Sequence, residues 1–323
     1  MNIAFAGFRH SHIYTLYDMA VENKNINIIG CFEENNEARE KAKTDKGIDF
    51  NYATYEDVLC DKSVEAVVIG DYYGKRGKVI IEALKCGKHI ICDKPICTSL
   101  SELDEIEKLT KEKSLKVICM LDMRVKAQVL KATELLKEGK VGELINITFT
   151  GQHCLDYGNR PSWYYEEGKH GGTLNDIAIH GIDVIRCMTG ENLTCVNFAK
   201  VWNGFATSEP QFCDCGQLAV EMGKIHVLAD VSYAAPKCNV TLPTYWDFYL
   251  WGKKGLINFR NSDSAVHVYT NTKEDFEVTQ KAYNFFDDYI AEIRGEAFCD
   301  NTSFTLESQR QVLLIQKKAD ENL

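Results

Sequence analysis

Residues 2–12 of the chain read Asn-Ile-Ala-Phe-Ala-Gly-Phe-Arg-His-Ser-His. A short apolar run that ends at a glycine predicts a buried strand, Asn2–Ala6, followed by a tight turn at Gly7. Similar apolar runs recur further along the chain and predict strands at Asn27–Cys31, Ala66–Ile69, His89–Cys92 and Leu115–Leu121. Stretches with a 3.6-residue period lie between them and predict helices at Glu37–Lys46, Lys78–Cys86 and Glu102–Lys113, the last with a capping box from Ser101 and Asp104. This alternation is typical of an α/β domain with a doubly wound parallel sheet.

The pattern changes after residue 121, and we expect two domains, 1–121 and 122–323. Alternating segments in the second domain predict strands of an open, mostly antiparallel sheet at Ile145–Gln152, Val196–Val201, Ile225–Tyr233, Trp246–Trp251 and Gly255–Phe259. Helices are expected at Lys126–Glu138 and Leu174–Met188, and near Ala282–Arg294 and Leu306–Asp320. The second domain is therefore predicted to be α+β, with C-terminal helices able to pack back on the first domain.

Charge and cysteine content narrow the classes of function and the cellular location that the sequence allows. The 323 residues carry 37 basic and 47 acidic side chains, a net charge of −10, which disfavours a protein that coats nucleic acid or an anionic membrane. The 13 cysteines are irregularly spaced, which favours reduced thiols and a cytoplasmic location, and no leader or long apolar run predicts export or membrane insertion. Cys213 and Cys215 are close in sequence, but a zinc site needs four ligands, so we expect no metal.

The turn after the first predicted strand is a candidate phosphate site, because a helix N-terminus binds anions there. A complete Gly-x-Gly-x-x-Gly fingerprint would place glycines at positions 7, 9 and 12, but the chain has Gly7, Arg9 and His12. Cofactor contacts are expected from Gly7, Phe8, Arg9 and His10. The alternative is an α/β turn that binds no nucleotide.

Glu33 follows the second predicted strand, at the place where an acidic side chain accepts hydrogen bonds from a ribose diol and repels a 2′-phosphate. NAD is therefore favoured over NADP as the cofactor. The alternative is that Glu33 and Glu34 belong to a solvated loop.

Two longer stretches carry a family resemblance: Gly87–Pro95 (GKHIICDKP) and Gly171–Asp183 (GGTLNDIAIHGID). In this order they resemble the glucose–fructose oxidoreductase/inositol dehydrogenase/rhizopine-catabolism family, written Gfo/Idh/MocA. The resemblance covers nearly the whole chain. Two departures from the family pattern are the missing fingerprint glycines and Asp71-Tyr72-Tyr73 in place of Thr-Pro-Asn.

The resemblance implies an N-terminal Rossmann domain that binds NAD(H) or NADP(H). It also implies hydride transfer at a hydroxyl-bearing carbon of a sugar, cyclitol or related small polyol, and a homodimer or homotetramer formed through the C-terminal sheet. Asp71, Asp93 and Lys94 are expected on the cofactor side. Two readings remain open beside this one: a cofactor-binding sensor or regulator without turnover, and an NAD-dependent glycosidase-like relative.

The matching family residues also imply the catalytic groups. Lys94 and His180 are expected to share substrate binding and proton transfer, Asp176 to orient His180, and Arg124 and Trp163 to contact the substrate. Which of Lys94 and His180 is the base stays open. The spacing of Asp176, His180 and Asp183 also predicts a polar stripe on one helix; its structural alternative is a buried His180 satisfied by Asp183.

Overall fold

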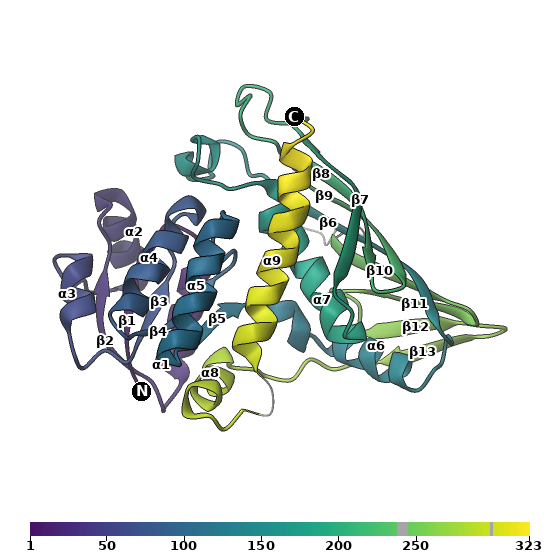
Figure 1. The fold of residues 1–323 in the computed structure, drawn as a ribbon, viewed down its shortest axis with the longest axis horizontal. Helices are drawn as coiled ribbons and strands as arrows, with labels where there is room; N and C mark the ends of the chain where they lie inside the picture. The colour runs from purple at the N-terminus through teal and green to yellow at the C-terminus, as the bar shows by residue number, and fades with distance from the viewer. Residues whose placement is uncertain (238–244, 298–299) are drawn as a thin grey trace. The chain divides into compact units, whose positions relative to one another are not determined.

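The computed structural model describes residues 1–237, 245–297 and 300–323 (Figure 1). The chain divides into two compact units. The first comprises Met1–Met120, Gly168–Gly171 and Tyr283–Gln309, and the second comprises Leu121–Glu167, Gly172–Ala282 and Arg310–Leu323.

The first unit is built on a five-stranded parallel sheet in the order β2-β1-β3-β4-β5 (Figure 1). Its strands are β1 (Asn2–Ala6), β2 (Asn27–Phe32), β3 (Ala66–Ile69), β4 (His89–Asp93) and β5 (Val117–Met120). All five predicted strands are confirmed, and β3 and β5 are buried along their whole length, as parallel strands covered on both faces should be. The strand order reverses between β1 and β3, so the loops that follow these two strands flank the point where such sheets bind ligands.

Helices of the first unit are α1 (His12–Glu22), α2 (Asn36–Lys46), α3 (Tyr55–Cys60), α4 (Tyr73–Lys85), α5 (Leu100–Lys113) and α8 (Phe285–Arg294). Local signals explain α2, where the Asn35 side chain accepts from the Ala38 amide and Gly47 ends the helix with φ +65°. The capping box expected from Ser101 and Asp104 is wrong: α5 begins earlier, with Ser99 as its N-cap and no side-chain cap bond. Helix α4 begins five residues before the predicted start, which places Arg76 inside it.

The second unit carries an eight-stranded sheet in the order β13-β12-β11-β10-β6-β9-β8-β7. Its strands are β6 (Leu144–Cys154), β7 (Leu193–Trp202), β8 (Cys215–Met222), β9 (Ile225–Ala235), β10 (Tyr245–Gly252), β11 (Gly255–Arg260), β12 (Ala265–Tyr269) and β13 (Lys273–Glu277). The expected strands are confirmed, and three further strands, β8, β12 and β13, were not predicted. Neighbouring strands are antiparallel except β6 and β9, which pair in parallel, with Asn146 opposite His226.

Helices α6 (Ala127–Lys137) and α7 (Ile179–Thr189) belong to the second unit, and α9 (Asn301–Asp320) contributes residues to both units. The predicted helix 174–188 is interrupted, because Leu174–Ala178 forms a π-helical turn before α7 begins. Gly181 of α7 lies so close to β6 that a Cβ there would meet the Phe149 ring at 2.3 Å. This close approach buries α7 nearly all round and brings its polar residues into the core. Among the described residues, no helix is long and apolar enough to cross a bilayer.

Candidate functional site

The loop after β1 lies against the end of β3. Gly7 has φ +83°, and a Cβ at this position would lie 2.7 Å from the Asp71 backbone nitrogen. The amides of Arg9 and His10 donate to the Gly70 carbonyl at 3.1 and 3.3 Å. Helix α1 then begins without a side-chain cap. A glycine is therefore required at position 7, and the uncapped start of α1 fits an anionic group such as a diphosphate.

Glu33 is 2% exposed and braces this loop. Its Oε2 accepts from the Phe8 amide at 2.5 Å and its Oε1 accepts from the Asn35 amide at 2.7 Å. Burial raises the pKa of Glu33, while the two amide bonds and the charge of Arg9 act in the opposite direction. Each carboxylate oxygen has a second lone pair that can accept another hydrogen bond. The contact between Glu33 and a ribose diol stays a prediction.

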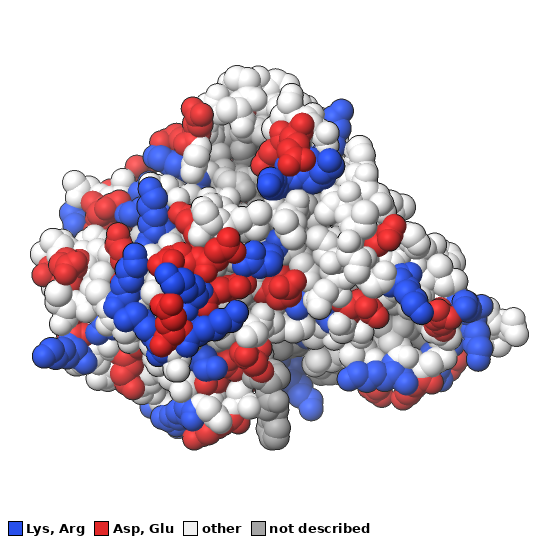
Figure 2. All heavy atoms as spheres, in the orientation of Figure 1, with Lys and Arg blue, Asp and Glu red and all other residues white. Residues whose placement is uncertain are grey.

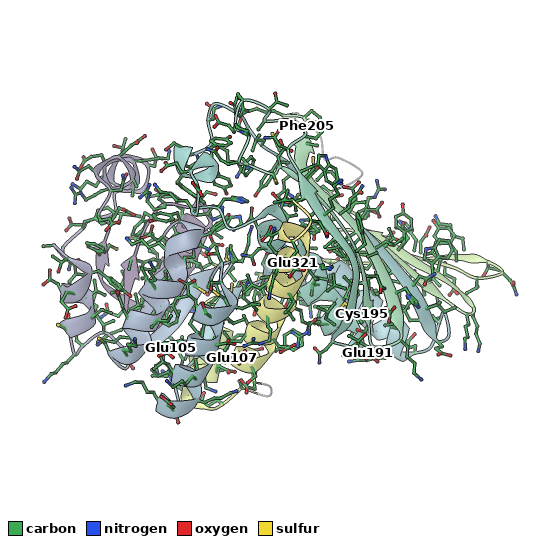
Figure 3. The ribbon with its side chains drawn as sticks, turned by 45° about the horizontal axis from the view of Figure 1, so that its top comes forward. Glu105, Glu107, Glu191, Cys195, Phe205 and Glu321 are labelled. Carbon is green, nitrogen blue, oxygen red and sulfur yellow. The ribbon has the colours of Figure 1, made fainter. Side chains whose placement is uncertain are left out.

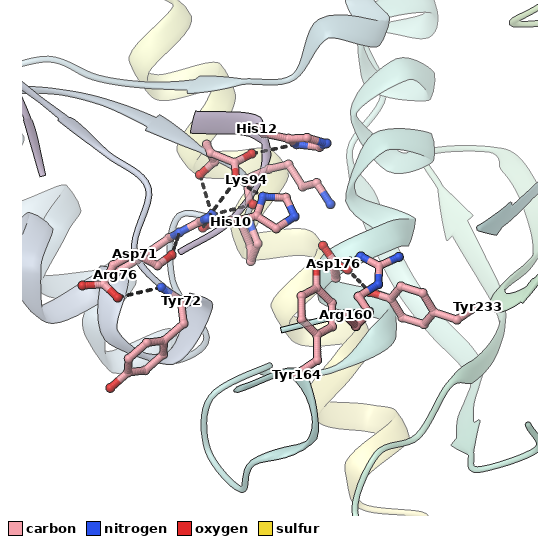
Figure 4. Close-up of polar contacts among 12 residues, drawn as sticks. His10, His12, Asp71, Tyr72, Arg76, Lys94, Arg160, Tyr164, Asp176 and Tyr233 are labelled. Carbon is pink, nitrogen blue, oxygen red and sulfur yellow. Dashed lines mark hydrogen bonds and ion pairs between the residues drawn. The ribbon is translucent and has the colours of Figure 1, made fainter. Parts of the chain in front are cut away.

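Arg76 holds the ends of β3 and β4 together. Its guanidinium is fully buried and donates to four backbone carbonyls, those of Asp71, Asp93, Lys94 and Pro95, at 2.5–3.1 Å. It also forms an ion pair with Asp93 at 2.8 Å. Arg76 therefore holds the backbone of Lys94 in place (Figure 4).

Asp93 is buried at the end of β4 and receives two imidazoles as well. The Nδ1 atom of His10 lies 2.5 Å from Oδ2, and Nδ1 of His12 lies 3.0 Å from Oδ1 (Figure 4). Burial would raise the pKa of Asp93, but the charge of Arg76 and the hydrogen bond from His10 outweigh it and hold the pKa well below its usual range. Burial lowers the pKa of His10 to about 3. Asp93 is thus a carboxylate at neutral pH, and His10 is a neutral imidazole.

The remaining first-unit residues predicted for the cofactor lie at the same edge of the sheet. Lys94 is 4% exposed, and its Nζ lies 5.9 Å from the centre of the Tyr73 ring. Asp71 is also buried and pairs with Lys75 at 2.9 Å. The Tyr72 ring is flanked by two cations, the Arg9 guanidinium carbon at 5.6 Å and the Lys169 Nζ at 5.2 Å from its centre.

Within the second unit, Asp176 lies on the π-helical turn and is 2% exposed. The Tyr233 hydroxyl donates to Asp176 Oδ2. The Arg160 guanidinium stands 4.7 Å from the Tyr164 ring and 5.3 Å from the Tyr233 ring, and it donates to the Tyr164 hydroxyl at 3.1 Å (Figure 4). Burial, and then the charge of Asp176, raise the pKa of Tyr233 far above its usual value. π-helical turns occur frequently at functional sites, which fits this polar group.

His180 is 7% exposed and lies on α7, with its ring edge-on to the Trp246 indole at 5.3 Å. Trp246 has φ +53°, and the strand register shifts between Tyr245 and Asp247. A left-handed backbone is rare for an aromatic residue, so Trp246 is a bulge residue that costs conformational energy. The bulge sets the indole against the imidazole, and the His153 ring also lies edge-on to the indole, at 5.4 Å.

Arg124 and Trp163, which were expected to contact the substrate, each contact another residue of the second unit. Arg124 donates to both carboxylate oxygens of Asp183, at 2.5 and 2.6 Å. Asp183 therefore pairs with Arg124. Trp163 is 1% exposed and its ring lies 4.2 Å from that of Tyr164. Substrate contacts by Arg124 and Trp163 stay predictions.

The paired glycines of the family motif have a backbone reason. Gly171 has φ +77° and Gly172 has φ +97°, a conformation that other residues rarely adopt. A Cβ on Gly172 would also meet the Gln316 side chain at 2.2 Å. These glycines therefore shape the chain just before the π-helical turn that carries Asp176.

Acidic and basic side chains alternate over the face shown in Figure 2, without a large area of one sign.

Two models of one family match the chain. The Gfo/Idh/MocA oxidoreductase family model, described as an NAD-binding Rossmann fold, matches residues 1–121, and the Gfo/Idh/MocA C-terminal domain matches residues 129–258. Levoglucosan dehydrogenase from Pseudarthrobacter phenanthrenivorans is 27% identical over 164 residues, which cover 49% of this chain and 42% of that protein. Myo-inositol 2-dehydrogenase from Thermotoga maritima is 24% identical over 147 residues, which cover 46% of this chain and 42% of that protein.

The matches thus span less than half the length of these curated relatives. A solved structure from Erwinia carotovora atroseptica matches the fold with a TM-score of 0.89 over 99% of this chain and 98% of that chain, at 22% identity. That likeness supports the fold alone. Each of the two family matches contains one of the two sequence motifs, and the chain belongs to the Gfo/Idh/MocA oxidoreductase family, whose N-terminal domain is an NAD-binding Rossmann fold.

Proposed function

We propose that this protein is an NAD-dependent oxidoreductase that transfers a hydride between nicotinamide and a hydroxyl-bearing carbon of a sugar, cyclitol or related small polyol. The observation that carries the proposal is the buried Asp93–Lys94 segment, fixed by Arg76 at the ligand-binding edge of a sheet of this family. The names of two relatives, levoglucosan dehydrogenase and myo-inositol 2-dehydrogenase, support the substrate class.

The loop after β1 would hold the cofactor. Gly7 keeps the loop close to the end of β3, the start of α1 accepts the diphosphate, and Arg9 adds a positive charge at the same loop. Glu33 would accept hydrogen bonds from the ribose diol. Bound nicotinamide supplies the hydride acceptor or donor, and the protein supplies the orientation and the proton transfer.

Alcohol oxidation releases a proton from the hydroxyl group, and a base within hydrogen-bond reach must accept it. Lys94 and His180 are our candidates for this base, each nearly buried in its own unit. Asp176, which accepts a hydrogen bond from Tyr233, would keep a negative charge that orients His180. Each candidate would accept the same proton, and mutagenesis decides which of the two is the base.

The substrate class is tested by a screen of sugars, cyclitols and small polyols with NAD, followed as absorbance of the reduced nicotinamide. We expect turnover with a compound that carries a secondary hydroxyl group on a ring. Tight NAD binding without turnover of any compound in either direction would instead favour the sensor or regulator reading.

Cofactor preference has a separate test. Because Glu33 would oppose the charge of a 2′-phosphate, NAD should bind more tightly than NADP in equilibrium titrations. Equal or tighter NADP binding would contradict the role of Glu33. Arg9 would then be the first residue to replace in search of the phosphate contact.

We also propose that the protein is a homodimer or homotetramer formed through the outer face of the second-unit sheet. That face exposes Phe198, Leu228 and Trp251, each between 45% and 57% exposed. A hollow of about 260 Å³ beside Phe198 and Leu228 is lined by residues of β6, β7, β8 and β9. Sedimentation at micromolar concentration tests this proposal, and a species with the mass of one chain would contradict it.

A cytoplasmic location is proposed from the thiols. None of the eleven cysteines among the described residues forms a disulfide, and Cys195 on β7 is exposed (Figure 3). Exposed cysteines persist as thiols where the surroundings are reducing. Fractionation of the native cells tests this assignment.

A further inference from the structure

His10, His12 and Asp93 bring three metal-ligating atoms together at one point of the first unit. One ring nitrogen of each histidine and one carboxylate oxygen all lie within 4.8 Å of one another. The imidazoles come from the loop after β1 and the first residue of α1, and the carboxylate comes from the end of β4. Their convergence follows from the sheet order and cannot be read from sequence spacing.

The two oxygens of Asp93 have different surroundings. Oδ2 receives the buried Arg76 guanidinium and His10, whereas Oδ1 receives His12. Carboxylates that bind metals are usually oriented by a hydrogen bond from a second residue. Arg76 fills that position, because it fixes Oδ2 and leaves Oδ1 directed toward the more exposed imidazole.

We propose that His10, His12 and Asp93 form a binding site for one divalent transition-metal ion, ligated by one ring nitrogen of each histidine and by one carboxylate oxygen of Asp93. Two imidazoles and a carboxylate are a ligand set that suits Zn²⁺, Co²⁺ and Fe²⁺. The side chain of His12 is 40% exposed, which gives an ion access from solvent. Three protein ligands also allow the ion to bind a further oxygen ligand, as in catalytic rather than structural zinc sites.

The charges around the site limit its affinity. Arg76 neutralises part of Asp93, and Lys94 adds a second positive charge near His10. We therefore expect a site that exchanges its ion with solvent rather than one that retains it through purification. This proposal is independent of hydride transfer, since it concerns the protein without cofactor or substrate.

Cobalt(II) is the most informative probe, because its visible absorption reports the ligands. The full-length reduced protein is stripped with a chelator and dialysed against cobalt(II), and bound metal is counted per chain. We expect one equivalent, with absorption typical of nitrogen and oxygen ligands and without the thiolate charge-transfer bands that cysteine binding would produce. Thiolate bands in the wild type, or no bound cobalt, would overturn the proposal.

A matched pair of variants locates the ion. His12→Ala should weaken cobalt binding by at least about tenfold, since even outer-shell changes cost 10–100-fold in metal affinity. His226→Ala, which removes an exposed histidine on β9, should bind cobalt as the wild type does. His12→Gln is the second variant, in case the alanine variant fails to fold as judged by circular dichroism. Unchanged affinity in a folded His12 variant, or an equal loss in His226→Ala, would overturn the assignment.

Discussion

Replacing Arg76 by methionine should destabilise the first unit strongly, because it removes the positive charge that faces a fully buried carboxylate. Asp93 and Arg76 both have 0% exposed side chains, and their ion pair is 2.8 Å long. Removing one partner of a buried ion pair costs about 3–5 kcal/mol, since the remaining charge stays buried without compensation. That is a large part of the roughly 5–15 kcal/mol by which a typical protein is stable.

A lysine at the same position separates charge from geometry. Arg76→Lys keeps the positive charge but offers three donors, where the guanidinium makes five hydrogen bonds to backbone and carboxylate oxygens. At about 0.5–1.5 kcal/mol for each bond lost, we expect Arg76→Lys to cost about 1–3 kcal/mol. Arg294→Met, which removes an exposed arginine at the end of α8, should change stability by less than about 0.5 kcal/mol.

Hydrogen exchange measured against urea concentration is the suitable assay, because it follows each unit separately. All four tryptophans lie in the second unit, at positions 163, 202, 246 and 251, so intrinsic fluorescence would follow that unit. Peptides from β3 and β4 should lose protection at lower urea in Arg76→Met, in the order methionine, lysine, wild type. An Arg76→Met protein within about 1 kcal/mol of the Arg294→Met control would refute the reasoning that Arg76 holds the ends of these strands.

Three further changes test the candidate site. His180→Ala should lower kcat by about 10²–10⁴-fold while NAD affinity stays nearly unchanged, and Lys94→Ala should lose a similar amount; a His180→Ala enzyme that keeps more than about a tenth of its turnover would move proton transfer to Lys94. Gly7→Ala should weaken NAD binding in equilibrium titration, because a Cβ would lie 2.7 Å from the Asp71 backbone nitrogen at φ +83°; wild-type affinity would show that the loop can shift at no cost. At pH 8, a thiol reagent followed by peptide mapping should label the exposed Cys195 and leave Cys31 unmodified, since burial raises the pKa of Cys31 to about 12 and keeps it protonated; equal labelling would contradict its burial.

The buried parallel strands were the most predictable part of the fold. Runs such as Ala66–Ile69 are apolar without interruption, and burial on both faces requires that composition. A helix was expected after the turn that follows β1, but its bounds were not predicted, since α1 starts at His12 without a side-chain cap. Strand β13 was missed because it is almost entirely exposed and carries no alternating pattern. The π-helical turn depends on how α7 packs against β6, which the local sequence does not encode.

The candidate site was partly predictable. Lys94 and His180 were found through family motifs, and Glu33 through its position after a strand. Arg76 looked like an ordinary basic residue between strands, and nothing in its neighbourhood indicates that it will be fully buried. An earlier predicted start for the helix would have placed Arg76 inside it and indicated a buried position. Tyr233 reaches Asp176 from a strand distant in sequence, so their hydrogen bond depends on tertiary structure.

The parallel pairing of β6 with β9 has a consequence for how the second unit assembles. Pairs such as β8–β9 and β10–β11 are joined by two-residue turns, with Met222 opposite Ile225 and Gly252 opposite Gly255, and such hairpins close within microseconds. Strand β6 lies between β10 and β9, and it can pair with β9 only after a long loop has closed. We therefore expect the hairpins to form first and the central strand to dock last. Until it docks, β9 and β10 each present an unpaired edge to other chains, so refolding yield should fall steeply as protein concentration rises.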